Sequence, residues 1–306
     1  MRPFTLALGE ADFDADATFK CGQVFRWKRQ TCGAWAGADG HTVMHLSQSG
    51  GKVRGLSNVG VAEVTAFLDL QRGDMTAEFC AGAHELADYM RLSRGVRLLN
   101  IEDCVETFCA FLCSANNHMR RIVPMVNFLG GHGVPHEWGT RFPELEAIAA
   151  LPESVLRAAG FGYRAASIPR ACREAIGRGG RTWLKQLAQS PYDEAFVELS
   201  SIYGFGPKLT DCVLLYGCGH TGAVPVDTHM WQLVVERVPE FGGETTLSAR
   251  SYRRVGDWFR NRFGLHAGYA QQRAFAGRLF SIQATTATFV KDSALNRSIS
   301  AENYKE

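Results

Sequence analysis

The chain has 306 residues, of which 46% are hydrophobic, and a formal net charge of +2. This length can bury a core for about two domains, and no apolar run approaches the ~18 residues of a membrane-spanning helix. The N-terminus lacks the basic and long apolar regions of a signal peptide. The nine cysteines lie mostly in apolar helical patterns, which indicates reduced thiols and an intracellular location.

The first 58 residues or so alternate and turn like antiparallel strands. Residues 23–28 and 42–46 are period-two runs, and turn signals lie at 38–40 and 49–51. From about Val61 the pattern becomes helical, with short loops marked by glycine and proline. We expect helices over 61–70, 76–91, 101–114, 119–128, 143–149, 165–176, 183–187, 191–202, 207–216, 228–235, 247–263 and 267–282.

This separation of strands from helices predicts an α+β fold with a groove between two subdomains. We expect an N-terminal antiparallel β domain with some helices over residues 1–95 and a larger helical domain over 96–284. Residues 285–306 are polar and should form a tail, which either frays or packs in part as an extension.

A helix–hairpin–helix pattern occupies about residues 198–217. Gly204-Phe205-Gly206 interrupts a helical pattern and Pro207 restarts it, because proline suits the first helical position. Lys208 then falls in the first turn, where the helix dipole disfavours the ammonium form and favours a nucleophilic amine. Lys208 is therefore a candidate Schiff-base nucleophile.

Asp227 follows Lys208 by 19 residues (227 − 208) and ends a Gly/Pro-rich loop over about 217–227. It suits an N-cap of the next helix. Taken alone, the lysine is explained by a surface position and the aspartate by capping. Together with the hairpin, they resemble the helix–hairpin–helix superfamily of base-excision DNA glycosylases. The resemblance implies backbone N–H groups that bind phosphate at Gly204 and Gly206 and a monovalent cation at the hairpin carbonyls.

Five more stretches, in order along the chain, resemble the eukaryotic-type 8-oxoguanine DNA glycosylase/AP lyase family. They are GQVFRW (22–27), GVRLL (95–99), CSANN (113–117), GFGYRA (160–165) and AGYAQ (267–271). The resemblance implies a β domain like that of the TATA-binding protein. It also implies a base-excision repair enzyme acting on double-stranded DNA that contains oxidised guanine. Because Cys218 is the last cysteine, the four-cysteine iron–sulfur loop of other superfamily members is lacking, and no metal or other cofactor is expected.

The family resemblance assigns roles to individual residues. Base removal and strand cleavage are assigned to Lys208 and Asp227. The damaged base is assigned to the Gly22 carbonyl, Gln271 and Phe275, with Cys212 against the lysine. The opposite cytosine is assigned to Arg121 and Arg164, with Tyr163 beside them, the wedge between the strands to Asn116, and a phosphate contact to His229.

Plainer explanations exist for several of these residues. Gly22 could turn a strand, Phe275 could belong to the core, and His229 could be a structural histidine. Asn116 and its neighbour could cap a helix C-terminus. Departures from the family pattern at Ala115 and His118 lie in the wedge segment and not in the catalytic stretch.

Charge clusters at 120–121, 164–181 and 250–262 could form a phosphate-binding face, although the latter two could equally be solvated helix faces. The leading hypothesis is a monomeric enzyme that excises 8-oxoguanine, preferably opposite cytosine, with lyase activity. The alternatives are a glycosylase for other damaged bases and a non-catalytic DNA-binding protein that uses the hairpin for phosphates.

Overall fold

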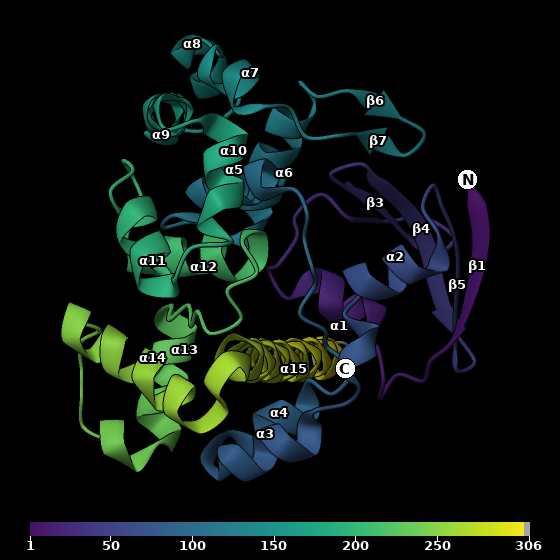
Figure 1. The fold of residues 1–306 in the computed structure, drawn as a ribbon. Helices are drawn as coiled ribbons and strands as arrows, with labels where there is room; N and C mark the ends of the chain where they lie inside the picture. Colours follow the sequence, from purple (N-terminus) through teal and green to yellow (C-terminus); the bar gives the residue numbers. More distant parts are fainter. Residues whose placement is uncertain (303–306) are drawn as a thin grey trace.

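The computed structural model describes the backbone of residues 1–302 and the side chains of residues 1–284. An antiparallel sheet lies at one side of the molecule and a larger body of helices at the other (Figure 1). The structure therefore confirms the predicted α+β arrangement. Among the described residues, no helix is both long enough and apolar enough to cross a membrane.

The N-terminal sheet has the strand order β1-β5-β4-β3-β2, and every neighbouring pair is antiparallel. Helices α1 and α2 pack on it, and Phe19 of α1 and Phe67 of α2 stack on either side of Trp27. The elements are β1 (Arg2–Ala7), α1 (Ala15–Lys20), β2 (Lys28–Arg29), β3 (Trp35–Asp39), β4 (Thr42–Ser49), β5 (Lys52–Ser57), α2 (Val61–Phe67) and η1 (Leu70–Arg72).

The strand predicted over 23–28 is wrong, because only its last residue enters a strand. The period-two burial is real, since Gln23, Phe25 and Trp27 are all buried. Their partners, however, are not one sheet. Phe25 packs against the helical body and Trp27 against the sheet. The segment therefore crosses between the two cores as bent, extended chain.

The helical body surrounds α5, which is buried along most of its length. Helix α8 and the β6–β7 hairpin were not anticipated, and each is short. The elements are α3 (Thr76–Gly82), η2 (His84–Leu86), α4 (Ala87–Leu92), α5 (Cys104–Ser114), α6 (Met119–Gly130), β6 (Pro135–His136), β7 (Gly139–Thr140), α7 (Leu145–Ala149), α8 (Glu153–Ala158), α9 (Arg164–Gly177), α10 (Gly180–Leu187), α11 (Tyr192–Ser200), α12 (Pro207–Gly217), α13 (Thr228–Arg237), η3 (Pro239–Phe241), α14 (Ala249–Phe263), η4 (Gly264–His266) and α15 (Ala267–Glu302).

Helices α3 and α4 belong to the core of the helical body, although they precede residue 95. Phe79 of α3 makes edge-to-face ring contacts with Phe263 and Tyr269, and α4 packs along α15. The chain therefore enters the helical body before residue 95 and returns to the sheet side near Leu99, which is buried in the sheet core.

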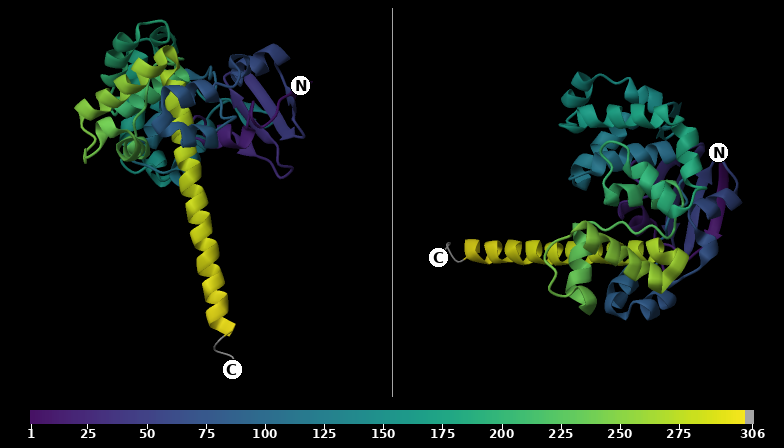
Figure 2. Two further views of the ribbon diagram at one scale, coloured as in Figure 1. Left: turned by 90° about the horizontal axis from the view of Figure 1, so that it is seen from below. Right: turned by 60° about the vertical axis from the view of Figure 1, so that its left-hand side comes forward.

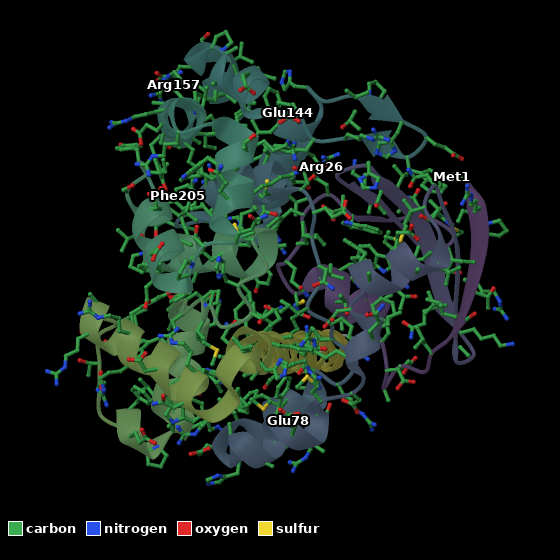
Figure 3. All side chains as sticks on the ribbon, in the orientation of Figure 1. Met1, Arg26, Glu78, Glu144, Arg157 and Phe205 are labelled. Atoms are coloured by element: carbon green, nitrogen blue, oxygen red, sulfur yellow. The ribbon has the colours of Figure 1, made fainter. Side chains whose placement is uncertain are left out.

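Two polar contacts join the sheet to the start of α5. Arg26 lies between the two parts of the molecule (Figure 3) and pairs with Glu106 at 2.9 Å. The Asp39 carboxylate, at the end of β3, accepts the backbone N–H groups of Glu102 at 2.6 Å and Asp103 at 2.9 Å. Because carboxylate bonds to N–H groups are strong and directional, these contacts fix α5 relative to the sheet.

Helix α15 is longer than predicted. Its first part packs against α4, α13 and α14, and the remainder projects away from the body (Figure 2). The helix continues to Glu302, where the sequence pattern predicts an end at 282 and a polar tail. The last residues of that tail, 303–306, lie outside the described residues.

Candidate active site

A cavity of about 290 Å³ lies where α5, α6, α12 and α15 meet, and we call it the lysine cavity. Every residue predicted to act in catalysis or to bind the damaged base lines it. They are Lys208 and Cys212 on α12, Asp227 before α13, Gly22 between α1 and β2, and Gln271 and Phe275 on α15; His229 lines it as well. Folding thus collects into one cavity groups that are up to about 250 residues apart in the chain (275 − 22 = 253).

The hairpin between α11 and α12 places Lys208. Gly204 has φ +90°, a left-handed conformation that a side chain would strain. Phe205 points inward and packs 4.8 Å from the Phe108 ring, which ties the hairpin to α5. Gly206 is the N-cap of α12 and Pro207 its first residue. The structure therefore confirms that Lys208 stands in the first turn of a helix.

The Lys208 side chain lies beside an aromatic ring and a thiol. Its Nζ lies 5.5 Å from the centroid of the Phe111 ring, and its charge lowers the pKa of the Cys212 thiol, which follows one helical turn later. Burial raises the pKa of Cys212 to about 11, although Lys208 opposes the rise. The thiol is therefore protonated at neutral pH, so it positions the lysine without taking its proton.

Asp227 combines a structural and a chemical role. It is the N-cap of α13, where its Oδ1 accepts the Met230 N–H at 2.8 Å. Its other oxygen accepts no hydrogen bond from the described residues. The charge of Asp227 also raises the pKa of Cys212, whereas that of Lys208 lowers it. Both catalytic candidates therefore lie close to the same thiol, and one Asp227 carboxylate oxygen has no hydrogen bond from the described residues.

The part of the cavity wall that α15 forms carries an unpaired acceptor. Gln271 is 2% exposed, and its Oε1 has no hydrogen-bond partner among the described residues. An unpaired buried acceptor is costly, so its presence in a cavity indicates a ligand that donates a hydrogen bond. Gly22 has φ +83°, and a Cβ there would meet no described atom within 4 Å. Its backbone therefore borders open space.

The segment between α5 and α6 presents Asn116. This residue is exposed and has φ +45°, a left-handed conformation that asparagine tolerates better than most residues. Its neighbour Asn117 donates to the Cys113 carbonyl at 3.0 Å. Asn117 therefore performs the helix capping that the sequence left open, and the Asn116 side chain is free of that role.

The three residues predicted beside the wedge do meet at this segment, but outside the lysine cavity. The Tyr163 hydroxyl donates to the Ala115 carbonyl at 3.2 Å, and Arg164 Nη2 donates to the carbonyls of Ala115 and Asn116. Arg164 is only 3% exposed, and its Nε lacks a partner among the described residues. Arg121 is exposed and donates to the Gly160 carbonyl at 3.2 Å.

Most arginines of the other two basic clusters are neutralised locally. Arg170, Arg178 and Arg181 pair with glutamates, and Arg254, Arg260 and Arg262 pair with carboxylates on or near α14. Arg120 makes no ion pair with a described residue. Helix α6, which contributes Met119 and Ile122 to the lysine cavity, thus carries positive charge without an ion pair to a described residue, whereas local pairing favours the solvated-face explanation for the other clusters.

Sequence reasoning missed several residues that line the lysine cavity: Lys20, Asn117, Met119 and Tyr216. Tyr216 could have been found, since it follows Lys208 by eight residues and Cys212 by four, which places all three on one helical face. Lys20 and Met119 carry no such spacing signal.

The described residues contain no group of three or more His, Cys, Asp or Glu side chains placed to hold a metal ion. The described cysteines are all free thiols. The monovalent cation expected at the hairpin carbonyls stays a prediction.

A helix–hairpin–helix that places a lysine and an aspartate in one cavity is typical of bifunctional DNA glycosylases. Residues 5–108 match the N-terminal domain of 8-oxoguanine DNA glycosylase. The chain is 31% identical to the N-glycosylase/DNA lyase OGG1 of Arabidopsis thaliana, in a match that covers 90% of this chain and 80% of the plant protein. The chain therefore belongs to the N-glycosylase/DNA lyase family.

Solved structures agree on the fold. An 8-oxoguanine glycosylase/lyase of Clostridium acetobutylicum, in complex with double-stranded DNA containing cytosine opposite 8-oxoguanine, superposes with a TM-score of 0.74. It is 24% identical, with 87% of this chain and 91% of that chain covered. The protein MBOgg1, in complex with a low-affinity DNA ligand, has a TM-score of 0.76 at 24% identity, with 92% and 99% covered.

Asp211, the residue before Cys212, anchors α12 from its other side. Its carboxylate accepts the hydroxyl of Tyr192 on α11 at 2.7 Å and that of Tyr252 on α14. Burial raises the pKa of Asp211 to about 6, and the two hydroxyl bonds and Arg260 only partly oppose this. The folded protein therefore binds the Asp211 proton more tightly than the unfolded chain does.

Asp211 should make stability fall as pH rises. Because its folded pKa exceeds its unfolded value of 3.8, the stabilisation is complete below about pH 4 and is lost through pH 6. Between pH 4 and 7, the free energy of unfolding of wild type relative to Asp211→Asn should fall by at most about 3 kcal/mol. Urea unfolding of both proteins across this range tests it; a difference that does not change with pH contradicts it.

Proposed function

We propose that the protein is a base-excision repair enzyme that removes 8-oxoguanine from double-stranded DNA, preferably opposite cytosine, and then cleaves the strand. The observation that carries this proposal is that Lys208, Asp227 and the unpaired Gln271 acceptor share one cavity. Its volume lies at the lower end of the range of about 300–1,000 Å³ for small-molecule sites. A single base turned out of the duplex suits that size.

Lys208 acts as the nucleophile. The lone pair of its neutral Nζ attacks C1′ of the extruded nucleotide, and the N-glycosidic bond breaks with its electron pair leaving on the base. Nζ gives up a proton and the departing base gains one. The Asp227 carboxylate stabilises the positive charge that develops on the sugar, which fits its spare oxygen in the lysine cavity.

Strand cleavage follows from the same covalent bond. The sugar ring then opens as the C1′–O4′ bond breaks and O4′ gains a proton. This gives an iminium between Nζ and C1′, which acidifies the C2′ proton. Loss of that proton expels the 3′ phosphate by β-elimination, and water then hydrolyses the imine and returns free Lys208. The thiol of Cys212 keeps its own proton throughout, since its pKa is about 11.

Two acceptors on the cavity wall account for the choice of base. Oxidised guanine carries an N–H at N7 where guanine has a lone pair, and the open backbone of Gly22 offers a carbonyl to it. Gln271 Oε1 accepts an N–H from the pairing edge, which guanine also has, so the Gly22 contact discriminates between the two. A misplaced donor or acceptor costs roughly 1–3 kcal/mol. Phe275, one turn after Gln271, supplies the stacking surface.

The opposite strand is held from the segment between α5 and α6. Asn116 fills the space that the extruded base leaves, on a backbone that Arg164 and Tyr163 hold. Arg121 donates to the O2 and N3 acceptors of the orphaned cytosine, and Arg164 uses the N–H groups that its carbonyl contacts leave free. Phosphates meet the hairpin N–H groups around Gly204 and Gly206, and the exposed His229.

The enzyme acts on DNA inside the cell and works as a monomer. One chain supplies every group of the lysine cavity, so chemistry requires no second copy.

Replacing Lys208 by Gln should lower single-turnover release of 8-oxoguanine by roughly 10³-fold or more, as expected for a nucleophile. Lys20→Gln is the matched control, because Lys20 lines the same cavity but pairs with Asp16 at 2.8 Å. It should stay within about threefold of wild type. Chromatography of bases released from a panel of damaged duplexes measures both effects.

Three results of this panel would overturn the proposal. Equal activity of wild type and Lys208→Gln would exclude Lys208 as the nucleophile. Faster release of another damaged base than of 8-oxoguanine reassigns the substrate, and binding without any base release indicates a non-catalytic DNA-binding protein.

Arg121→Ala should reduce the preference for cytosine over adenine opposite the lesion by roughly 10- to 100-fold, since a bidentate base contact is worth about 1–3 kcal/mol. Arg120→Ala removes a neighbouring exposed charge and should lower the excision rate on both duplexes by the same factor. Excision rates on the two duplexes give the ratio. A preference that survives in Arg121→Ala refutes the cytosine contact.

A further inference from the structure

A buried chain of hydrogen bonds links the catalytic helix to the segment that carries Gly22. The Tyr216 hydroxyl, on α12, donates to Gln272 Oε1, on α15. Gln272 Nε2 in turn donates to the carbonyl of Cys21 at 3.3 Å and to its Sγ at 3.0 Å. The residue immediately before Gly22 is therefore held by a side chain of α15.

A second glutamine holds the same segment from the other side. Gln23 Nε2 donates to the Arg97 carbonyl at 2.7 Å and to Cys21 Sγ at 3.2 Å, and Gln23 Oε1 accepts the Leu99 N–H at 2.9 Å. Both residues that flank Gly22 are thus fixed by buried side chains. Gly22 itself borders open space in the lysine cavity, so among the described residues its support comes through its neighbours in the chain.

The Tyr216 end of the chain leads back to the nucleophile. The Tyr216 ring stacks on Phe111 with a centroid distance of 5.5 Å and an interplanar angle of 13°. The Lys208 Nζ lies 5.5 Å from the centroid of that same Phe111 ring. Tyr216 and Lys208 also lie two turns apart on one helix, so each contact that holds Tyr216 holds the lysine's helix.

These polar groups are placed where an apolar core would otherwise form. Gln272 is 0% exposed and Tyr216 is 5% exposed. Burial also raises the pKa of Tyr216, so its hydroxyl stays a neutral donor. Because a partly satisfied buried network is destabilising and a fully satisfied one orients its members, a role in orientation accounts for these residues.

We propose that Tyr216 and Gln272 are positioning residues that set the Gly22 carbonyl relative to Lys208, and so tune the choice of base. This inference rests on the proposed function. The Gly22 carbonyl contacts the base, whereas cleavage at an abasic site requires Lys208 and has no base to contact. The network should therefore matter more for excision of 8-oxoguanine than for abasic-site cleavage.

The test compares two activities in the same preparations. Tyr216→Phe removes one hydroxyl and keeps the ring, and Gln272→Leu removes both ends of the amide. Each should lower 8-oxoguanine excision relative to abasic-site cleavage by roughly fivefold or more, because Gly22 is no longer held. In the double variant, the ratio of excision to abasic-site cleavage should be no lower than in the more affected single variant, since the two residues act as one unit.

Tyr269→Phe is the matched control. Tyr269 is also buried on α15, and its hydroxyl donates to the Val96 carbonyl at 3.3 Å away from the lysine cavity. It should leave the ratio of the two activities unchanged, while thermal unfolding reports its effect on stability.

Equal losses of both activities in Tyr216→Phe, or the same ratio change in Tyr269→Phe, would overturn the inference and leave the proposed function standing. A wild-type protein that cleaves abasic sites but releases no 8-oxoguanine would overturn the proposed function and this inference with it. A selective loss of excision in Tyr216→Phe and Gln272→Leu supports the inference.

Discussion

The chemistry of this protein depends on holding α12 still while its first turn faces a cavity. Gly206 is the N-cap of α12 and Pro207 its first residue, so the backbone of Lys208 is fixed in the first turn of the helix. Asp211 joins the helix to α11 and α14 through two tyrosine hydroxyls, at the cost of a buried carboxyl whose pKa rises to about 6. The far end is tied to α15 through Tyr216. Contacts with three neighbouring helices thus fix the helix that carries Lys208.

The remaining parts of the site are positioned by reference to that helix. The Gly22 segment crosses from the sheet to the helical body and meets α15, and Asp227 begins α13 beside the same thiol that contacts Lys208. Asn116 and Arg121 lie outside the cavity, at the segment between α5 and α6. In the proposed mechanism, the arrangement separates the chemistry on the damaged nucleotide from the recognition of the opposite base.

The local pattern of the chain predicts the parts of this account that depend on short-range rules. The glycines and proline of the hairpin, the N-cap at Asp227 and the helical faces are all readable from spacing. Residues 23–28 show where such rules fail. Burial alternates along this segment as it would in a strand, but the segment crosses between two cores and pairs with no sheet over most of its length. The proposed role of Gln272 could not be predicted from the sequence, because it depends on contacts with Cys21 and Tyr216, which are far away in the chain. The burial of Arg164 likewise depends on how α9 meets the segment after α5.

The central claim is that the attacking amine is Lys208, and two lysines line the cavity. Borohydride reduction of wild-type protein during reaction with 8-oxoguanine DNA, followed by peptide mass spectrometry, locates the covalent adduct. The account predicts the reduced sugar on the peptide that contains Lys208, with fragment ions assigning it to that side chain. An adduct on Lys20, or no adduct on a protein that still cleaves the strand, would contradict it.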